Sequence, residues 1–151
     1  YKDSKVRSSM VVFVLTLSQL CNVFYARELQ KRLANKPSTQ GIVVNSFNPG
    51  LIVGTDLFRD QNPVFTKLFD IAATDLLRVG ENPDWGGGCL SYMTQVNSRG
   101  QFYSSAPRTS KYDDEAYGNQ FSISEVSKEA RDDAKAQRLW DLTAKELGIQ
   151  V

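Results

Sequence analysis

The fold is decided by residues 20–50, LCNVFYARELQKRLANKPSTQGIVVNSFNPG, which combine the patterns of a helix, a loop and a strand. Residues 20–33 carry apolar side chains on one helical face and charged side chains on the other, which is typical of an amphipathic helix. The apolar face comprises Leu20, Val23, Phe24, Leu29 and Leu33, and the polar face comprises Arg27, Glu28, Lys31 and Arg32. Residues 35–40 contain Pro37 and predict a loop. Residues 41–47, GIVVNSF, predict a short buried strand that ends at the Pro49-Gly50 turn. This order predicts an α/β unit, and open parallel sheets bind their ligands at such a strand end.

The rest of the chain extends this unit. Residues 51–96 carry spaced aromatic and aliphatic side chains, and we interpret them as short helices that form a substrate-side lid. Residues 101–105, QFYSS, predict a second strand, and residues 106–121 a polar loop. Residues 122–147 predict a C-terminal helix that ends before Gly148. Its apolar stripe comprises Leu139, Trp140, Leu142 and Leu147. The sequence offers three N-caps for it: Ser122, which has capping-box spacing to Glu125, Ser124 and Ser127.

Composition narrows the classes of function. The 151 residues include 18 basic and 17 acidic side chains, so the charge gives no reason to expect binding to nucleic acid or to an anionic membrane. The chain has no histidine and only two cysteines, Cys21 and Cys89, which argues against a metal site, a histidine relay or a disulfide framework. The apolar run Met10–Leu17 is too short to span a bilayer. We expect an enzyme or binding domain for a small molecule, without a transmembrane segment, and leave open whether it is a homo-oligomer.

The motif that carries chemistry is Tyr1-Lys2-Asp3-Ser4-Lys5. On a helix Tyr1 and Lys5 share one face, about 6 Å apart. A free tyrosine has a pKa of about 10, and a neighbouring ammonium favours the phenolate and lowers that value. Lys5 also has three donors that can hold the ribose hydroxyls of a nicotinamide nucleotide. The pair therefore predicts proton transfer by Tyr1 with Lys5 as its partner.

The order of these motifs resembles the short-chain dehydrogenase superfamily, in which a Tyr/Lys helix precedes a strand that ends in Pro-Gly. Within it, the chain resembles the light-dependent protochlorophyllide reductases most closely. The resemblance is carried by YKDSK at 1–5, the Cys21-Asn22 step, LFRD at 57–60, and the tail 127–141 with SKEARD and LWD.

The resemblance implies the C-terminal portion of a doubly wound Rossmann-type parallel sheet, with NADPH as cofactor and a chloroplast location. It also implies light-dependent reduction of a tetrapyrrole, protochlorophyllide, in chlorophyll biosynthesis. The implied catalytic residues are Tyr1 and Lys5; the implied cofactor-binding residues are Lys5, Pro49, Gly50, Ile52 and Thr55; the implied substrate residues are Cys21 and Phe58.

Several positions depart from the family pattern. Leu51 stands where the family usually has cysteine, Gly54-Thr55 where it has two threonines, and residues 72–93 match poorly. Two alternatives therefore stay open. One is a dark short-chain dehydrogenase that acts on an apolar carbonyl such as a retinoid or steroid. The other is an inactive truncated product, since the Gly-rich nucleotide-binding half of the family is not in this sequence. We expect 1–151 to be the C-terminal part of one dehydrogenase domain and not to turn over alone.

Residues 6–19 form an insertion relative to the family, in which the lysine is followed almost directly by the Cys-Asn step. Deletion of Val6–Gln19 restores one continuous amphipathic helix; deletion of Arg7–Leu20 is the other option. We favour a translated, unspliced intron, because every valine codon begins with GT and a glutamine codon can end in AG. A genuine insertion is the alternative, and sequencing of spliced transcripts separates the two. As helix, the insert adds about 21 Å and turns the face by roughly 40°, although its valines favour a strand.

Overall fold

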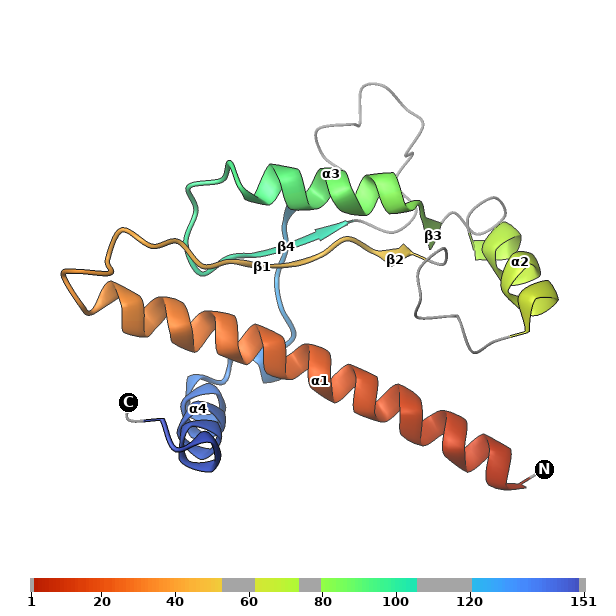
Figure 1. The fold of residues 1–151 in the computed structure, drawn as a ribbon, viewed down its shortest axis with the longest axis horizontal. Helices are drawn as coiled ribbons and strands as arrows, with labels where there is room; N and C mark the ends of the chain where they lie inside the picture. The colour runs from red at the N-terminus through yellow and green to blue at the C-terminus, as the bar shows by residue number, and fades with distance from the viewer. Residues whose placement is uncertain (1, 53–61, 74–79, 106–120, 150–151) are drawn as a thin grey trace. The chain divides into compact units, whose positions relative to one another are not determined.

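The chain folds into two compact units in its computed structural model, which describes residues 2–52, 62–73, 80–105 and 121–149. For residues 2–12 and 15 the backbone alone is described. The first unit comprises residues 1–46, 98–101 and 125–151, and the second comprises 47–97 and 102–124. Figure 1 shows the elements in chain order: α1 (Lys2–Ala34), β1 (Ser46–Asn48), β2 (Leu51–Ile52), α2 (Pro63–Ile71), β3 (Gly80–Glu81), α3 (Pro83–Met93), β4 (Phe102–Ser105), β5 (Phe121–Ile123), the 3-10 helix η4 (Glu129–Arg131) and α4 (Asp133–Leu147). The predicted α/β class is confirmed.

Helix α1 contains the predicted helix 20–33 and continues without a break through residues 6–19. The strand preference of the valines in that stretch does not prevail, since a β-branched residue lowers helix propensity by only about 0.5 kcal/mol and an existing helix propagates readily. The helix ends at Ala34, where Thr39 Oγ1 donates to the Leu33 carbonyl at 2.9 Å. The loop predicted at 35–40 is confirmed as a series of turns.

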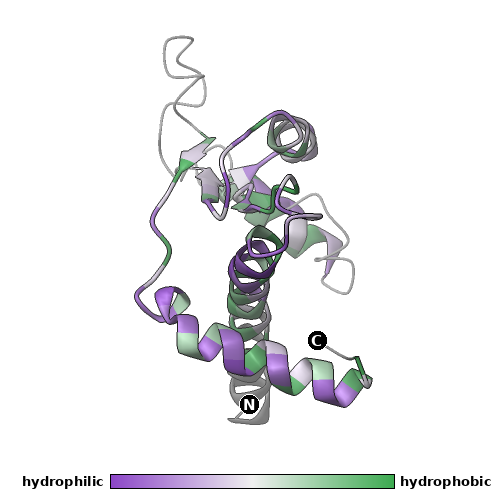
Figure 2. Cartoon of the chain, turned by 90° about the vertical axis from the view of Figure 1, so that its left-hand side faces the viewer, coloured by the Kyte–Doolittle hydropathy of each residue, from purple (hydrophilic) through white to green (hydrophobic). Residues whose placement is uncertain are grey.

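Packing of α4 across α1 holds the first unit together (Figure 1). Phe24 of α1 is buried as predicted, and the buried positions of α4 are the small residues Ala136 and Ala144. Small side chains at i and i+8, with Trp140 between them, let the two helices approach closely. The predicted stripe of α4 is therefore wrong in part. Leu139 and Trp140 are half-buried, whereas Leu142 and Leu147 are exposed, and Figure 2 shows hydrophobic and hydrophilic residues alternating along this helix.

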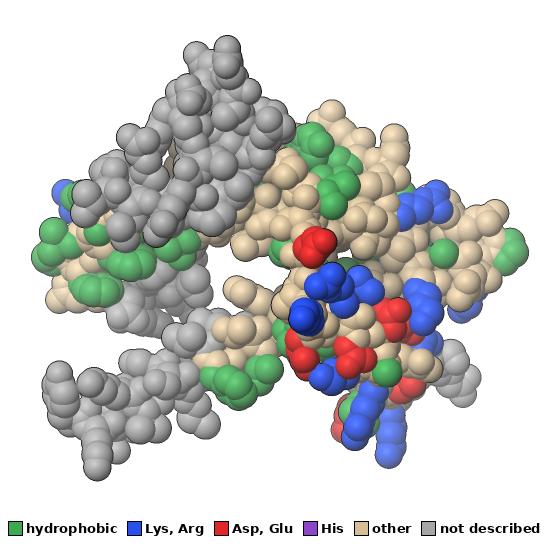
Figure 3. All heavy atoms as spheres, turned by 180° about the vertical axis from the view of Figure 1, so that it is seen from behind, with side chains coloured by type: hydrophobic (Ala, Val, Ile, Leu, Met, Phe, Trp, Pro, Cys, Tyr) green, Lys and Arg blue, Asp and Glu red, His purple; other side chains and the backbone are tan. Residues whose placement is uncertain are grey.

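The polar face of α1 is also more buried than predicted. Glu28 is only 5% exposed, and its carboxylate accepts a hydrogen bond of 2.7 Å from Arg32 Nε. Arg32 also reaches Asp141 of α4 at 3.2 Å, and its guanidinium carbon lies 4.9 Å from the ring centroid of Trp140. Glu28 can be buried because a guanidinium neutralises it. In the view of Figure 3, the acidic side chains lie among basic ones.

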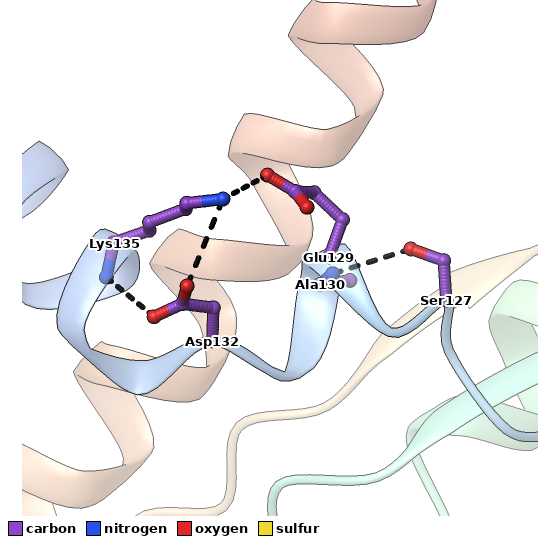
Figure 4. Close-up of polar contacts among 5 residues, drawn as sticks. All are labelled: Ser127, Glu129, Ala130, Asp132 and Lys135. Atoms are coloured by element: carbon purple, nitrogen blue, oxygen red, sulfur yellow. Dashed lines mark hydrogen bonds and ion pairs between the residues drawn. The ribbon is translucent and has the colours of Figure 1, made fainter.

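Helix α4 begins at Asp133, so the predicted helix 122–147 starts too early. Ser122 lies in strand β5, and Ser127 Oγ accepts from the Ala130 N–H of η4 at 3.2 Å, so neither serine caps α4. The cap of α4 is Asp132, whose carboxylate accepts from the Lys135 N–H at 3.1 Å (Figure 4). The end was predicted correctly, because Gly148 has the left-handed φ of 65° that a helix C-terminus favours.

The segment 41–47 is not the buried strand that its composition predicts. Ile42 and Val43 are exposed, and the strand β1 begins only at Ser46. Side-chain and backbone bonds together hold the segment. Val44 N donates to Gln30 Oε1 at 2.7 Å, the Val44 carbonyl accepts from Gly100 N at 2.9 Å, and Asn45 Nδ2 donates to the Ser98 carbonyl at 2.7 Å. Because these bonds satisfy the backbone of Val44 and fix Asn45, the extended pairing starts later.

The second unit is built from short strands and two helices. Strands β1, β4 and β5 form a sheet in that order, with Ser105 of β4 opposite Phe121 of the antiparallel β5, while β2 and β3 pair in parallel. The strand predicted at 101–105 is confirmed as β4. The core of the unit consists of buried Cys89, Tyr103 and Phe121 with half-buried Phe47, Trp85, Met93 and Val96.

The region 51–96 contains the predicted short helices as α2 and α3, but also strands β2 and β3, which the sequence did not predict. Helix α2 buries no residue and exposes Val64, Phe65 and Leu68. Among the described residues, no helix combines the length and the apolarity that crossing a membrane requires.

Candidate active site

The predicted catalytic pair is only partly described. Tyr1 lies outside the described residues, and Lys5 lies in α1, where the backbone alone is described. Cys21 lies in the same helix as a half-buried free thiol. Lys5 and Cys21 thus belong to one continuous helix, with the fifteen residues 6–20 between them.

The predicted cofactor turn is a defined structure in the second unit. Pro49 and Gly50 are half-buried and connect β1 to β2. The Gly50 N–H donates to Asn48 Oδ1 at 3.1 Å, so the asparagine side chain closes the turn on its own backbone. Gly50 has a φ of 95°, a conformation that side chains other than glycine rarely adopt. Glycine at position 50 is therefore needed for this turn.

Ile52 follows the turn in β2 and pairs with Glu81 of β3. Helix α3 lies against it, since a Cβ added to Gly86 would lie 2.5 Å from Ile52 Cδ1. Gly86 thus leaves room for the Ile52 side chain. The structure brings together Pro49, Gly50 and Ile52 on one segment, whereas Thr55 and Phe58 lie outside the described residues.

Two buried polar residues complete this part of the candidate site and were missed by the sequence analysis. Ser105 Oγ, at the end of β4, donates to Glu81 Oε1 at 2.9 Å, and both side chains are buried. The signal that could have located Glu81 is the pair Asn82-Pro83, which caps α3 through a 2.7 Å bond from the Trp85 N–H to Asn82 Oδ1. A cap at Asn82 ends the preceding strand at Glu81.

The surroundings of Cys89 in the second unit change the pKa of its thiol. Burial, and after it the negative charge of Glu81, raise the pKa of the Cys89 thiol from 9.0 to about 11, against an opposing backbone hydrogen bond that lowers it. A thiol with this pKa is protonated at neutral pH and is a poor nucleophile. Among the described residues, no group of three or more histidine, cysteine or acidic side chains could hold a metal ion.

Helix α2 gives the second unit an exposed apolar surface. Asn62 caps it by accepting from the Val64 N–H at 2.9 Å, and Phe65 and Phe69 stack with ring centroids 6.0 Å apart. The exposed ring of Phe65, stacked on the half-buried Phe69 and beside the exposed Val64 and Leu68, is suited to a flat apolar molecule.

Comparison with known proteins identifies the relatives of this chain. No family model matches it. A chloroplastic protochlorophyllide reductase of Chlamydomonas reinhardtii is 29% identical over 99% of this chain and 32% of its own length. The corresponding protein of Cucumis sativus is 26% identical over 99% of this chain and 31% of its own length, and protochlorophyllide reductase A of Oryza sativa subsp. japonica is 28% identical over 87% and 32%. The chain spans about a third of the length of these relatives. Over nearly all of its length, the chain is similar to proteins named protochlorophyllide reductase.

Proposed function

We propose that this chain is the C-terminal part of an NADPH-dependent oxidoreductase that reduces protochlorophyllide to chlorophyllide in light, in the chlorophyll biosynthesis of a chloroplast. The observation that carries the proposal is the similarity of the whole chain to proteins named protochlorophyllide reductase. In this proposal the described strands are the C-terminal portion of a doubly wound Rossmann-type sheet.

The described residues fit the nicotinamide end of the cofactor. The Pro49-Gly50 turn lies at the carboxyl end of β1, the end at which open α/β sheets bind ligands, and it is only half-buried. Pro49, Gly50, Ile52 and Thr55 would hold the nicotinamide, and Lys5 the ribose. When bound, NADPH supplies the hydride.

The residues of the chain supply the proton and the substrate surface. Tyr1 donates a proton from its phenol oxygen, and the ammonium of Lys5 stabilises the phenolate that remains. Cys21 and Phe58 would contact the substrate. The exposed apolar face of α2, with Val64, Phe65 and Leu68, would pack against the tetrapyrrole plane.

The test uses the full-length gene product that contains this chain, with residues 6–19 deleted. It is mixed with NADPH and protochlorophyllide, and absorption spectra are recorded in darkness and after a light flash. A red-shifted product band that appears only after the flash supports the proposal, and Tyr1→Phe should remove it. A folded, NADPH-binding protein without this band would overturn it. In that case, oxidation of NADPH in darkness by a retinoid or steroid carbonyl would indicate a dark dehydrogenase.

A further inference from the structure

A buried carboxylate lies at the candidate cofactor turn. Glu81 is 7% exposed and Ser105 is 6% exposed, and the hydroxyl of Ser105 donates to Glu81 Oε1 at 2.9 Å. Removal of a carboxylate from water is costly, so a buried one is retained only where neighbouring groups hold it in a defined position. Both residues stand at the ends of strands, Glu81 closing β3 and Ser105 closing β4.

The side chain of Glu81 lies directly against the backbone of Gly50. A Cβ added to Gly50 would lie 2.7 Å from Glu81 Cγ and 3.3 Å from Glu81 Oε1. The space beside the turn is therefore filled by the glutamate, and only glycine leaves room for it. The positive φ of Gly50 gives a second, independent reason for glycine at this position.

The backbone of Glu81 supports the same segment. In the parallel ladder Glu81 pairs with Ile52, and Gly80 pairs with Leu51. The two residues that follow the Pro49-Gly50 turn are thus fixed by β3, and the turn itself is packed by the Glu81 side chain. Ser105 fixes the direction of the carboxylate from a third strand.

We propose that Glu81, oriented by Ser105, is a positioning residue that fixes the Pro49-Gly50 turn for the nicotinamide end of the cofactor. This inference rests on the proposed function for the identity of the ligand. Glu81 itself does not contact the reacting atoms; it acts through Gly50 and Ile52. Its loss should therefore weaken binding at the nicotinamide end of NADPH and leave the adenosine end unaffected.

The bracing of the turn is tested first in the 151-residue chain by hydrogen exchange. In Glu81→Ala the amides of Leu51 and Ile52 should exchange at least roughly tenfold faster, since a local opening there becomes easier, while amides of α4 keep their rates. Glu81→Gln should restore slow exchange, because its side-chain oxygen can accept the same bond from Ser105. Glu146→Ala removes an exposed carboxylate and is the matched control. Unchanged exchange in Glu81→Ala would overturn the inference.

The role toward the cofactor is tested by binding to the full-length gene product with residues 6–19 deleted. The probes are NADPH and adenosine 2′,5′-bisphosphate, which lacks the nicotinamide. Glu81→Ala should raise the Kd for NADPH by roughly tenfold, as loss of one oriented contact does, and Ser105→Ala, which removes only a hydroxyl, should act in the same way. Both variants should keep the Kd for the bisphosphate within about twofold of the parent value. Glu81→Gln should bind NADPH like the parent protein. Equal loss for both probes, or no loss, would overturn the positioning role.

The same experiment separates this inference from the proposed function. If the parent protein binds neither probe, the proposed function fails, and the exchange result in the 151-residue chain still decides whether Glu81 braces the turn. If the parent protein binds NADPH but shows no light-dependent reduction, the substrate assignment fails, and the contrast between the two probes supports or overturns the role of Glu81.

Discussion

At the scale of the residue, ionisation of Cys89 makes the free energy of unfolding of the chain depend on pH. Its side chain is 3% exposed, and burial followed by the charge of Glu81 raises its pKa from 9.0 to about 11. The unfolded chain ionises this thiol at lower pH than the folded chain does. The folded state therefore binds more protons between pH 9.0 and about 11, and the stability present below pH 9.0 is lost as the pH rises through this window.

We expect Cys89→Ala to remove this pH dependence. In urea unfolding at several pH values across the window, the free energy of unfolding of the parent chain should fall by up to about 1.4 kcal/mol per pH unit more steeply than that of the variant. Cys21→Ala removes the half-buried thiol of α1 and is the matched control. Equal slopes for Cys89→Ala and the parent chain would contradict the assignment.

At the scale of the element, α3 offers two adjacent glycines with different surroundings. A Cβ at Gly87 meets nothing within 4 Å, whereas one at Gly86 would lie 2.5 Å from Ile52 Cδ1. Gly87→Ala should raise the free energy of unfolding by about 0.5–1 kcal/mol, because alanine favours the helix. Gly86→Ala should gain about 1 kcal/mol less, since Ile52 must leave its rotamer. Urea denaturation measures both, and equal gains would show that Ile52 does not pack against α3.

The start of α4 gives a second prediction at this scale. Asp132 caps the helix, and its carboxylate also lies 3.7 Å from Lys135 Nζ, while Lys135 reaches Glu129 as well (Figure 4). Asp132→Ala should lower the free energy of unfolding by about 1 kcal/mol. Ser122→Ala, at the cap that the sequence suggested, should change it by less than about 0.5 kcal/mol because Ser122 is exposed in β5. The reverse order in thermal or urea unfolding would contradict the helix boundary.

The same elements show which features of the fold could be predicted from the sequence. Helix 20–33, strand β4 and the end of α4 at Gly148 follow local rules of periodicity and capping, and they were predicted. The start of α4 could not be fixed, because three serines and Asp132 are all residue types that cap helices, and tertiary contacts choose among them. Strands β2 and β3 have two residues each and exist only through their pairing, so no sequence window marks them.

The candidate site likewise has one part that the sequence predicts and another that it does not. The Pro49-Gly50 turn was predicted, since its residue types dictate its backbone. The buried pair of Glu81 and Ser105 was not, because a contact between residues 24 positions apart leaves no local pattern. The exposure of Leu142 and Leu147 was missed for a related reason: small residues of α4, rather than its leucines, face α1.

At the scale of the whole molecule, residues 6–19 decide whether the two ends of α1 can serve one site. They are helical, so they add about 21 Å along the helix axis between Lys5 and Cys21 and turn the face by roughly 40°. A misplacement of a catalytic group by about 1 Å can already cost a hundredfold in rate. Under the proposed function, Lys5 and Cys21 therefore cannot both keep the spacing that the family pattern predicts while residues 6–19 are present.

We expect deletion of residues 6–19 from the full-length gene product to raise the light-dependent turnover at least roughly a hundredfold. The matched control replaces the insert with fourteen residues of an alanine-rich helix, which keeps the length and removes the sequence; it should stay as slow as the insert-bearing protein. If this control regained activity, the apolar side chains of the insert rather than its length would be at fault. Normal turnover by the insert-bearing protein would contradict the expected defect altogether, because it would mean that Tyr1 and Lys5 reach the substrate from a helix about four turns longer than the family pattern predicts.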